Sequence, residues 1–128
     1  YLLTVQLGFN LNVSPSNLAA NWWTVPVYVL AAAMNGIVEE VIMVGYLFTR
    51  WSQAGWRAAT VVGLSALIRG TYHLYQGFGG FVGNVVMGLV FGLVFLRTRR
   101  VLTLVAAHTI MDVVVFVGYP VARANGLL

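Results

Sequence analysis

Residues 25–48 read VPVYVLAAAMNGIVEEVIMVGYLF, an apolar run that contains two adjacent glutamates. A run of this length is enough for an α-helix to cross the ~30 Å hydrocarbon core of a bilayer, which takes ~20 residues. The whole chain of 128 residues holds only three acidic residues, and Glu39 and Glu40 are two of them. A charge at the bilayer centre costs ~2.5–3.5 kcal/mol on insertion scales, so such residues usually face a protein interior and serve a function.

The composition indicates that lipid, not water, surrounds the protein. Hydrophobic residues make up 60% of the chain and charged residues 8%, against roughly 45–50% and about 25% in ordinary soluble domains. The net charge of +4 comes from seven arginines, and in so apolar a chain it favours charge at membrane ends over a nucleic-acid surface. Because cysteine is absent, disulfides, thiolate metal ligands and a cysteine nucleophile are excluded.

Three further apolar segments follow, at residues 58–75, 78–96 and 101–119. We expect each to be a helix, because an open sheet would leave backbone groups unpaired in lipid. The sequence therefore predicts an all-α fold, a polytopic transmembrane bundle with at least four spanning helices. We expect a single membrane-embedded domain over residues 1–128, with its core motifs in 25–119, and a chain that is a fragment of a longer protein. Gly88 and Gly92 have GxxxG spacing, which favours close helix packing.

The remaining polar residues of the predicted spans occur in pairs at helical spacing. Arg69 and His73 are four residues apart on the second segment, and His108 and Asp112 repeat that spacing on the fourth. Side chains four residues apart lie on one face of a helix, so each pair can serve one site. We therefore predict one buried polar cluster that gathers these pairs with the glutamates of the first segment.

The side chains of the two adjacent glutamates cannot both point in the same direction. Glu39 and Glu40 differ by ~100° around a helix, so we expect one to face the centre and the other to pair with an arginine or with backbone groups. Arg69 and Asn84 are predicted as substrate contacts or charge partners of the cluster.

Carboxylates and imidazoles together can activate water as a nucleophile. A second histidine can stabilise the negative charge that develops on a tetrahedral oxyanion. The hydroxyl groups of Ser65 and Thr109 lie near these residues, but neither has a GxSxG context, so serine catalysis is not expected. The residue set predicts a hydrolase that works without a covalent intermediate.

The order of the motifs resembles that of a known family. The stretches are EEVIMVGYLFTR at 39–50, ALIRGTYHLYQG at 66–77 and AHTIMD at 107–112. An EE pair, a histidine ending the next helix and a later HxxxN or HxxxD resemble the CAAX prenyl protease and bacteriocin-processing family of intramembrane proteases. The resemblance covers residues 25–119. It implies an intramembrane endopeptidase that is independent of metal and cofactors and acts on a peptide or a membrane-anchored protein within the lipid bilayer.

The resemblance also implies a role for each residue. Glu39 is expected to be the general base that acts on water, with His73 as its partner on that water. His108, together with Asp112, is expected on the oxyanion side of the site. Glu40 is expected to support the site as a neighbouring acid.

Three positions depart from the family pattern. The arginine of the EExxxR motif is replaced by Val44, the aromatic residue four before the histidine by Arg69, and the frequent asparagine by Asp112. We infer that Arg69 supplies the charge that Val44 lacks, a hypothesis that unchanged activity and folding of an Arg69→Ala variant would refute. An ionised Asp112 cannot donate to an oxyanion, so it is either protonated or orients His108.

Two other functions fit the same residues. Two histidines with carboxylates can hold zinc with an open position for water, as in a zinc-dependent membrane metalloprotease. Buried glutamate–histidine chains also relay protons, so a proton-coupled transporter or a non-enzymatic scaffold is an alternative. For every alternative we expect an integral, multi-pass protein of a prokaryotic plasma membrane, with no nucleic-acid partner.

Overall fold

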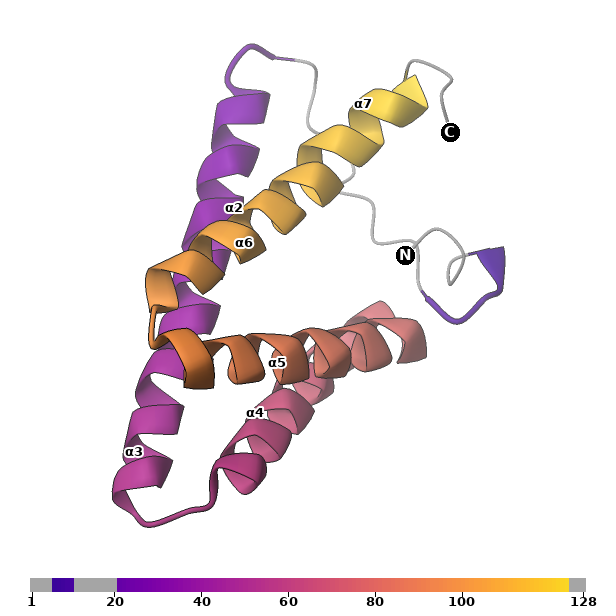
Figure 1. The fold of residues 1–128 in the computed structure, drawn as a ribbon. Coiled ribbons are helices and arrows are strands. Elements are labelled where there is room, and N and C mark those ends of the chain that lie inside the picture. The colour runs from indigo at the N-terminus through magenta and orange to yellow at the C-terminus, as the bar shows by residue number, and fades with distance from the viewer. Residues whose placement is uncertain (1–5, 11–20, 125–128) are drawn as a thin grey trace. The chain divides into compact units, whose positions relative to one another are not determined.

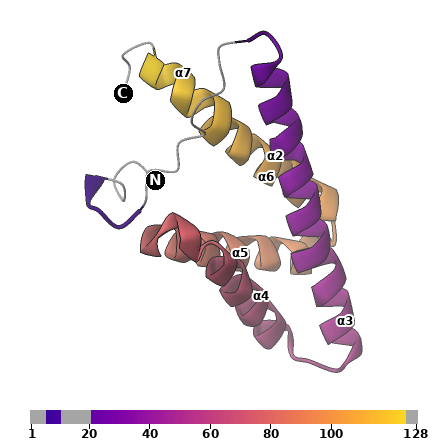
Figure 2. The same ribbon diagram turned by 180° about the vertical axis from the view of Figure 1, so that it is seen from behind.

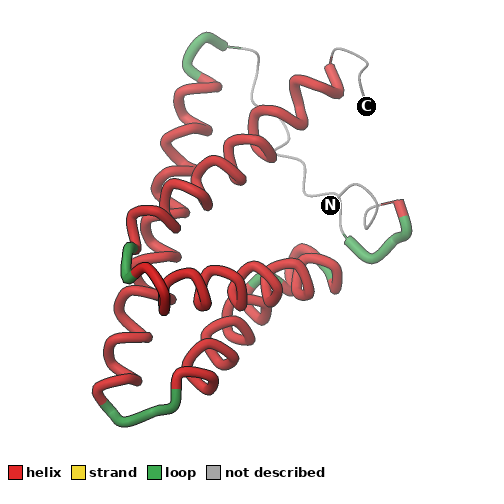
Figure 3. Tube along the Cα trace, in the orientation of Figure 1, coloured by secondary structure: helices red, strands yellow, loops and turns green. Residues whose placement is uncertain are grey.

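The computed structural model describes residues 6–10 and 21–124, and its regular elements are all helical (Figure 3). The prediction of an all-α chain is confirmed for these residues. In chain order the elements are α2 (Thr24–Glu40), the π-helix η1 (Val41–Tyr46), α3 (Leu47–Gln53), α4 (Ala58–Tyr72), the 3-10 helix η2 (Leu74–Gln76), α5 (Phe78–Thr98), α6 (Val101–Val113), the π-helix η3 (Val114–Gly118) and α7 (Tyr119–Ala124).

The contacts divide the chain into two compact units, which are described separately. The α2–α6 unit consists of residues 15–41 and 100–128, and the α4–α5 unit of residues 1–14 and 42–99. Each unit brings together segments that are distant in the sequence. The single domain expected over residues 1–128 stays a prediction.

Three helical stretches among the described residues are long and apolar enough to cross a membrane, namely Thr24–Gln53, Phe78–Thr98 and Val101–Ala122. The predicted segment 58–75 differs, because α4 has only 15 residues and reaches ~22 Å, short of the ~30 Å hydrocarbon core. Its helix ends where His73 leaves helical geometry (ψ 4°), and a 3-10 turn follows. The fourth span of the predicted bundle therefore stays a prediction.

In the α2–α6 unit the two helices lie side by side where they cross, as both Figure 1 and Figure 2 show. The crossing occurs at Gly36, because a Cβ atom there would lie 2.8 Å from the Thr109 Oγ1 atom and 3.2 Å from the Val105 carbonyl oxygen. Contacts of this length leave no room for a side chain. Glycine thus allows α2 and α6 to approach closely one turn away from the glutamates.

In the α4–α5 unit the two helices also pack against each other. A Cβ atom on Gly88 would lie 2.8 Å from the Ala66 Cα atom, and one on Gly92 would lie 3.0 Å from the Phe48 Cζ atom. The close packing expected from the GxxxG spacing is therefore present. Phe48 meets Phe95 edge to face, with ring centroids 5.5 Å apart, a favourable arrangement for aromatic rings.

Many of the outward-facing side chains of the spans are large and apolar. Leu30 is 70% exposed, Ile110 64% and Leu102 80%. An apolar outer surface of this kind is suited to lipid tails rather than water. Together with the three candidate spans, this surface identifies an integral membrane protein.

We expect Gly36→Leu to separate α2 from α6 and to destabilise the protein by about 1–3 kcal/mol, the usual cost of overpacking. Gly63→Leu on α4 is the matched control, because a Cβ atom at Gly63 has no neighbour within 4 Å. Its effect should stay within ~0.5 kcal/mol. Denaturant titration of both variants in detergent micelles gives the free energies of unfolding. Equal effects would show that the crossing at Gly36 is not tightly packed.

Candidate active site

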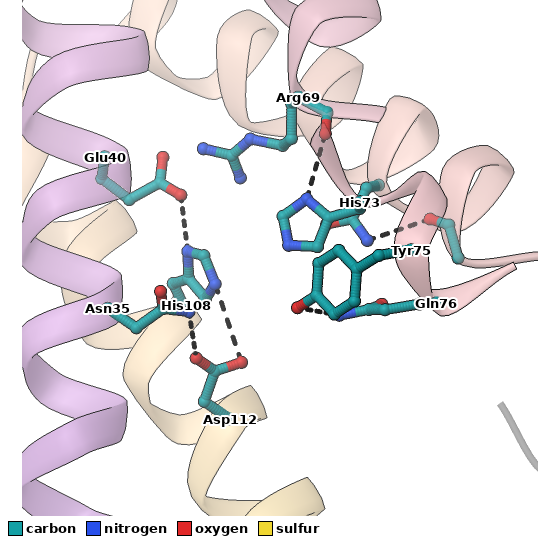
Figure 4. A network of polar contacts seen from close by, with 10 residues as sticks. Asn35, Glu40, Arg69, His73, Tyr75, Gln76, His108 and Asp112 are labelled. Carbon is teal, nitrogen blue, oxygen red and sulfur yellow. Dashed lines mark hydrogen bonds and ion pairs between the residues drawn. The ribbon is translucent and has the colours of Figure 1, made fainter. Parts of the chain in front are cut away.

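The central contact of the α2–α6 unit joins the last residue of α2 to the middle of α6. The Glu40 Oε1 atom lies 2.7 Å from the His108 Nδ1 atom, and both side chains are almost fully buried. An ionised carboxylate can only accept, so Nδ1 carries the proton and donates it to Glu40. Figure 4 shows the His108 ring pointing from α6 toward the Glu40 carboxylate. This short, buried bond orients the imidazole.

Asp112 occupies the other side of the same ring. Its Oδ1 atom lies 3.7 Å from the His108 Nε2 atom, within ion-pair range but beyond hydrogen-bond length. Its Oδ2 atom accepts a hydrogen bond of 2.8 Å from the Asn35 Nδ2 atom on α2. Both ring nitrogens of His108 therefore face carboxylate oxygens, one in direct contact and one held at a distance.

Glu39 lies beside this chain of contacts and is half-buried on α2. Its negative charge acts on the His108 ring, as do the charges of Asp112 and Glu40. The sequence predicts that one glutamate faces the centre while the other has a supporting contact. Here Glu40 makes the contact with His108, and the catalytic role of Glu39 stays a prediction.

In the α4–α5 unit, His73 follows the last residue of α4 and is buried. Its Nδ1 atom lies 3.0 Å from the Arg69 carbonyl oxygen, which can only accept, so Nδ1 carries a proton. The ring of Tyr72 lies 4.6 Å from the His73 ring, and that of Tyr75 lies 6.1 Å away. These contacts hold the imidazole in one orientation, and Figure 4 shows its hydrogen bond with the Arg69 carbonyl oxygen.

The other two predicted residues of this unit have contacts of their own. The Arg69 side chain is buried, and its Cζ atom lies 5.7 Å from the centre of the Phe91 ring, a cation–π distance. Asn84 donates its side-chain amide to the Gly80 carbonyl oxygen of its own helix at 2.9 Å. Their roles as substrate contacts or charge partners stay predictions.

One π-helix follows the glutamates of α2, and another follows Asp112 of α6. η1 begins directly after Glu40, and η3 begins two residues after Asp112. Such wide turns are rare and often mark functional sites. Within η1, the Met43 carbonyl oxygen accepts a buried hydrogen bond of 2.9 Å from the Ser65 hydroxyl. The Ser65 side chain is thus engaged in supporting the backbone of η1.

The contact between Asn35 and Asp112 is the part of the site that the sequence reasoning missed. The available signal was spacing, because Asn35 precedes Glu39 by four residues and so shares its helix face. Among the described residues, no group of three or more histidine, aspartate or glutamate side chains is arranged to hold a metal ion. The predicted residues thus fall into two groups, with Glu39, Glu40, His108 and Asp112 in one unit and Arg69, His73 and Asn84 in the other.

Comparison with known proteins identifies the family. The family model described as type II CAAX prenyl endopeptidase Rce1-like matches residues 21–114, which is most of the chain. No curated protein and no solved structure matches the chain significantly. The chain belongs to the Rce1-like family, as the motifs predict, and it is therefore assigned to the membrane proteases. The metal dependence and the residue roles remain to be proposed.

We expect a double-mutant cycle to detect the bond between Glu40 and His108. The effects of Glu40→Gln and His108→Ala on the free energy of unfolding should be non-additive by about 1–3 kcal/mol, because His108→Ala removes the buried hydrogen bond that Glu40→Gln weakens by removing its charge. Asn21→Ala, at an exposed position three residues before α2, should combine additively with Glu40→Gln, to within ~0.5 kcal/mol. If denaturant titration in detergent showed additive effects for Glu40→Gln with His108→Ala as well as for the control pair, the contact between Glu40 and His108 would be contradicted.

Proposed function

We propose that this protein hydrolyses a peptide bond within the membrane with a water molecule that Glu39 and His73 activate. Glu39 takes a proton from the water, whose oxygen forms a bond to the carbonyl carbon. His108, positioned by Glu40 and Asp112, donates to the oxygen that gains negative charge. When the carbon–nitrogen bond breaks, Glu39 returns the proton to the leaving amine nitrogen.

The observation that carries this proposal is the short contact between Glu40 and His108 in a chain of the Rce1-like family. Because Glu40 is bound to the imidazole, its carboxylate is engaged in holding His108. The adjacent Glu39 does not make that hydrogen bond, and its half-buried carboxylate is the better candidate for the base. This division of labour agrees with the roles that the family resemblance implies.

The two histidines support the proposal through their hydrogen-bond partners. His73 donates Nδ1–H to a backbone carbonyl, so its Nε2 atom can accept a proton or a hydrogen bond from water. His108 lies between carboxylates, and these stabilise a doubly protonated ring that can donate from Nε2.

The substrate that we propose is a peptide or a membrane-anchored protein, in keeping with the family. We further propose a prokaryotic plasma membrane as the location. A peptide with a prenylated CAAX end is the natural first probe, because the description of the family names that substrate class.

We expect Glu39→Gln to lower kcat on such a peptide by about 10²–10⁴-fold, the usual contribution of a general base. Glu40→Gln should lower kcat less, because glutamine can still pair with the His108 Nδ1 atom through its amide oxygen. Both variants should remain folded in detergent, which circular dichroism checks. The comparison uses the protein reconstituted in lipid vesicles, with steady-state kinetics as the measurement.

The two variants distinguish a reversal of the two glutamate roles from failure of the glutamate mechanism itself. An inactive Glu40→Gln beside an active Glu39→Gln would reverse the two roles but keep a glutamate mechanism. Full activity of both variants would refute the glutamate mechanism altogether.

We expect activity to survive metal chelation. After dialysis against EDTA or 1,10-phenanthroline, cleavage of the probe peptide should stay within about twofold of the untreated rate, since the mechanism uses only side chains and water. A loss of activity that returns on addition of Zn²⁺ would instead favour the zinc-dependent alternative.

A further inference from the structure

The exposed charges of the α4–α5 unit are all positive. Its residues, 1–14 and 42–99, include five arginines and no aspartate or glutamate. Arg69 is buried. The other four arginines are exposed, namely Arg50, Arg57, Arg97 and Arg99. Because the sequence of the unit contains no carboxylate side chain, an anion that neutralises these four charges must come from outside the unit.

The register between α4 and α5 brings two of these arginines to the same end of the unit. Two glycine contacts define it, Gly88 with Ala66 and Gly92 with Val62. Because the contact moves four residues back along α4 as it moves four residues forward along α5, the two helices are antiparallel. Arg57, directly before α4, and Arg97, in the last turn of α5, lie at the same level in this register.

A pair of stacked tryptophans joins α3 to the start of α4 at this end. The rings of Trp51 and Trp56 have centroids 5.4 Å apart and planes 12° apart, and the Trp56 N–H donates to the Trp51 carbonyl oxygen at 3.0 Å. Arg50 directly precedes this pair and Arg57 directly follows it. Tryptophan is enriched at membrane–water interfaces, where its ring lies at the level of the headgroups. An aromatic pair between two arginines is therefore suited to the membrane surface.

Arg99 adds a fourth charge where α5 meets α3. It caps α5 with a φ of 56°, and its N–H donates to the Phe95 carbonyl oxygen at 2.8 Å. The Arg99 Cζ atom lies 5.7 Å from the centre of the Phe95 ring, and that ring contacts Phe48 of α3. Positive charge thus gathers where α3 and α5 end and α4 begins. We call this surface, formed by the four exposed arginines with Trp51 and Trp56, the basic end.

We propose that the basic end binds the phosphate groups of anionic lipids at the membrane surface. A guanidinium group donates two parallel hydrogen bonds to a phosphate and is weakly hydrated for a cation. In an integral membrane protein, the headgroups of anionic lipids are the anions that surround the ends of apolar helices. Each arginine near such a surface is attracted by about fivefold in affinity, or ~1 kcal/mol. The four arginines of the basic end supply this attraction together.

Lipid binding at the basic end also fixes how deeply α4 enters the membrane. α4 begins directly after Arg57 and has 15 residues, which reach ~22 Å. The hydrocarbon core is ~30 Å thick, so an α4 helix whose start is held at headgroup level ends inside that core. His73, which follows its last residue, then lies away from both membrane surfaces. The inference goes beyond the proposed function, because lipid binding does not require cleavage and is measured without it.

Tryptophan fluorescence measures lipid binding at the basic end directly. The chain contains four tryptophans, so replacing Trp22 and Trp23 by phenylalanine leaves only Trp51 and Trp56. The full chain is reconstituted in phosphatidylcholine vesicles that contain either brominated phosphatidylglycerol or brominated phosphatidylcholine, because bromine quenches a nearby tryptophan. We expect the anionic lipid to be preferred by about fivefold or more at ~0.05 M salt, and the preference to shrink at ~0.5 M salt, where screening is stronger.

Charge-changing variants test which arginines are responsible. Arg57→Gln combined with Arg97→Gln should lower the preference for the anionic lipid by at least about threefold, since two surface charges are lost. Arg57→Lys combined with Arg97→Lys should retain the preference to within about twofold, because both charges stay. The control is Arg123→Gln, which removes one arginine from the other unit. Circular dichroism checks that each variant is folded.

The position of the bromine atoms gives an independent measure of depth. Bromine near the headgroup should quench Trp51 and Trp56 more strongly than bromine at the end of the acyl chain. The reverse order would overturn the inference, because the basic end would then lie within the hydrocarbon core. Equal binding of the two lipids by the starting protein would overturn it as well. An unchanged preference in the double glutamine variant would show that other residues attract the lipid, and would also contradict the inference.

Discussion

The hydrogen bond between Glu40 and His108 is the constraint on which the α2–α6 unit depends. Lipid offers no water to satisfy a buried carboxylate or imidazole, so each group must find its partner within the protein. Hydrophobic burial does not select one rotation of two apolar helices in lipid, since lipid tails are as apolar as the side chains. A rotation that turns Glu40 and His108 toward each other gives each of them a hydrogen-bond partner within the unit. The polar pair therefore defines which faces of α2 and α6 meet.

Close approach of the backbones makes that pairing geometrically possible. Gly36 lies one turn before Glu40, and its missing side chain lets α2 contact α6 at Thr109, next to His108. The α4–α5 unit uses the same device at Gly88. Small residues provide the proximity, and polar residues then select the rotation, so the two features act on different degrees of freedom of a helix pair.

Much of this arrangement could be predicted from the sequence because its signals are local. Apolar runs predict helices, and the i,i+4 spacing of His108 and Asp112 places both on one face. Adjacency alone could not distinguish the roles of Glu39 and Glu40, which came from the family resemblance, since it fixes only an angle of ~100° and not the direction of the neighbouring helix. The short length of α4 could not be predicted from the apolar pattern either, because the helix ends at a backbone turn at His73 within an apolar segment. The bond from Asn35 to Asp112 spans 77 residues, so the spacing of Asn35 on its own helix could not identify its partner on α6.

The two histidines show how surroundings assign chemistry that residue type alone does not. His73 binds a backbone carbonyl, a neutral partner that fixes a proton on Nδ1. His108 binds a carboxylate and faces a second one, and these negative partners favour a ring that donates from both nitrogens. A hydrolase that polarises water at one point and stabilises an oxyanion at another needs this difference. The difference arises because α4 ends at His73 and supplies a carbonyl group, whereas α2 supplies the carboxylate that meets His108 on α6.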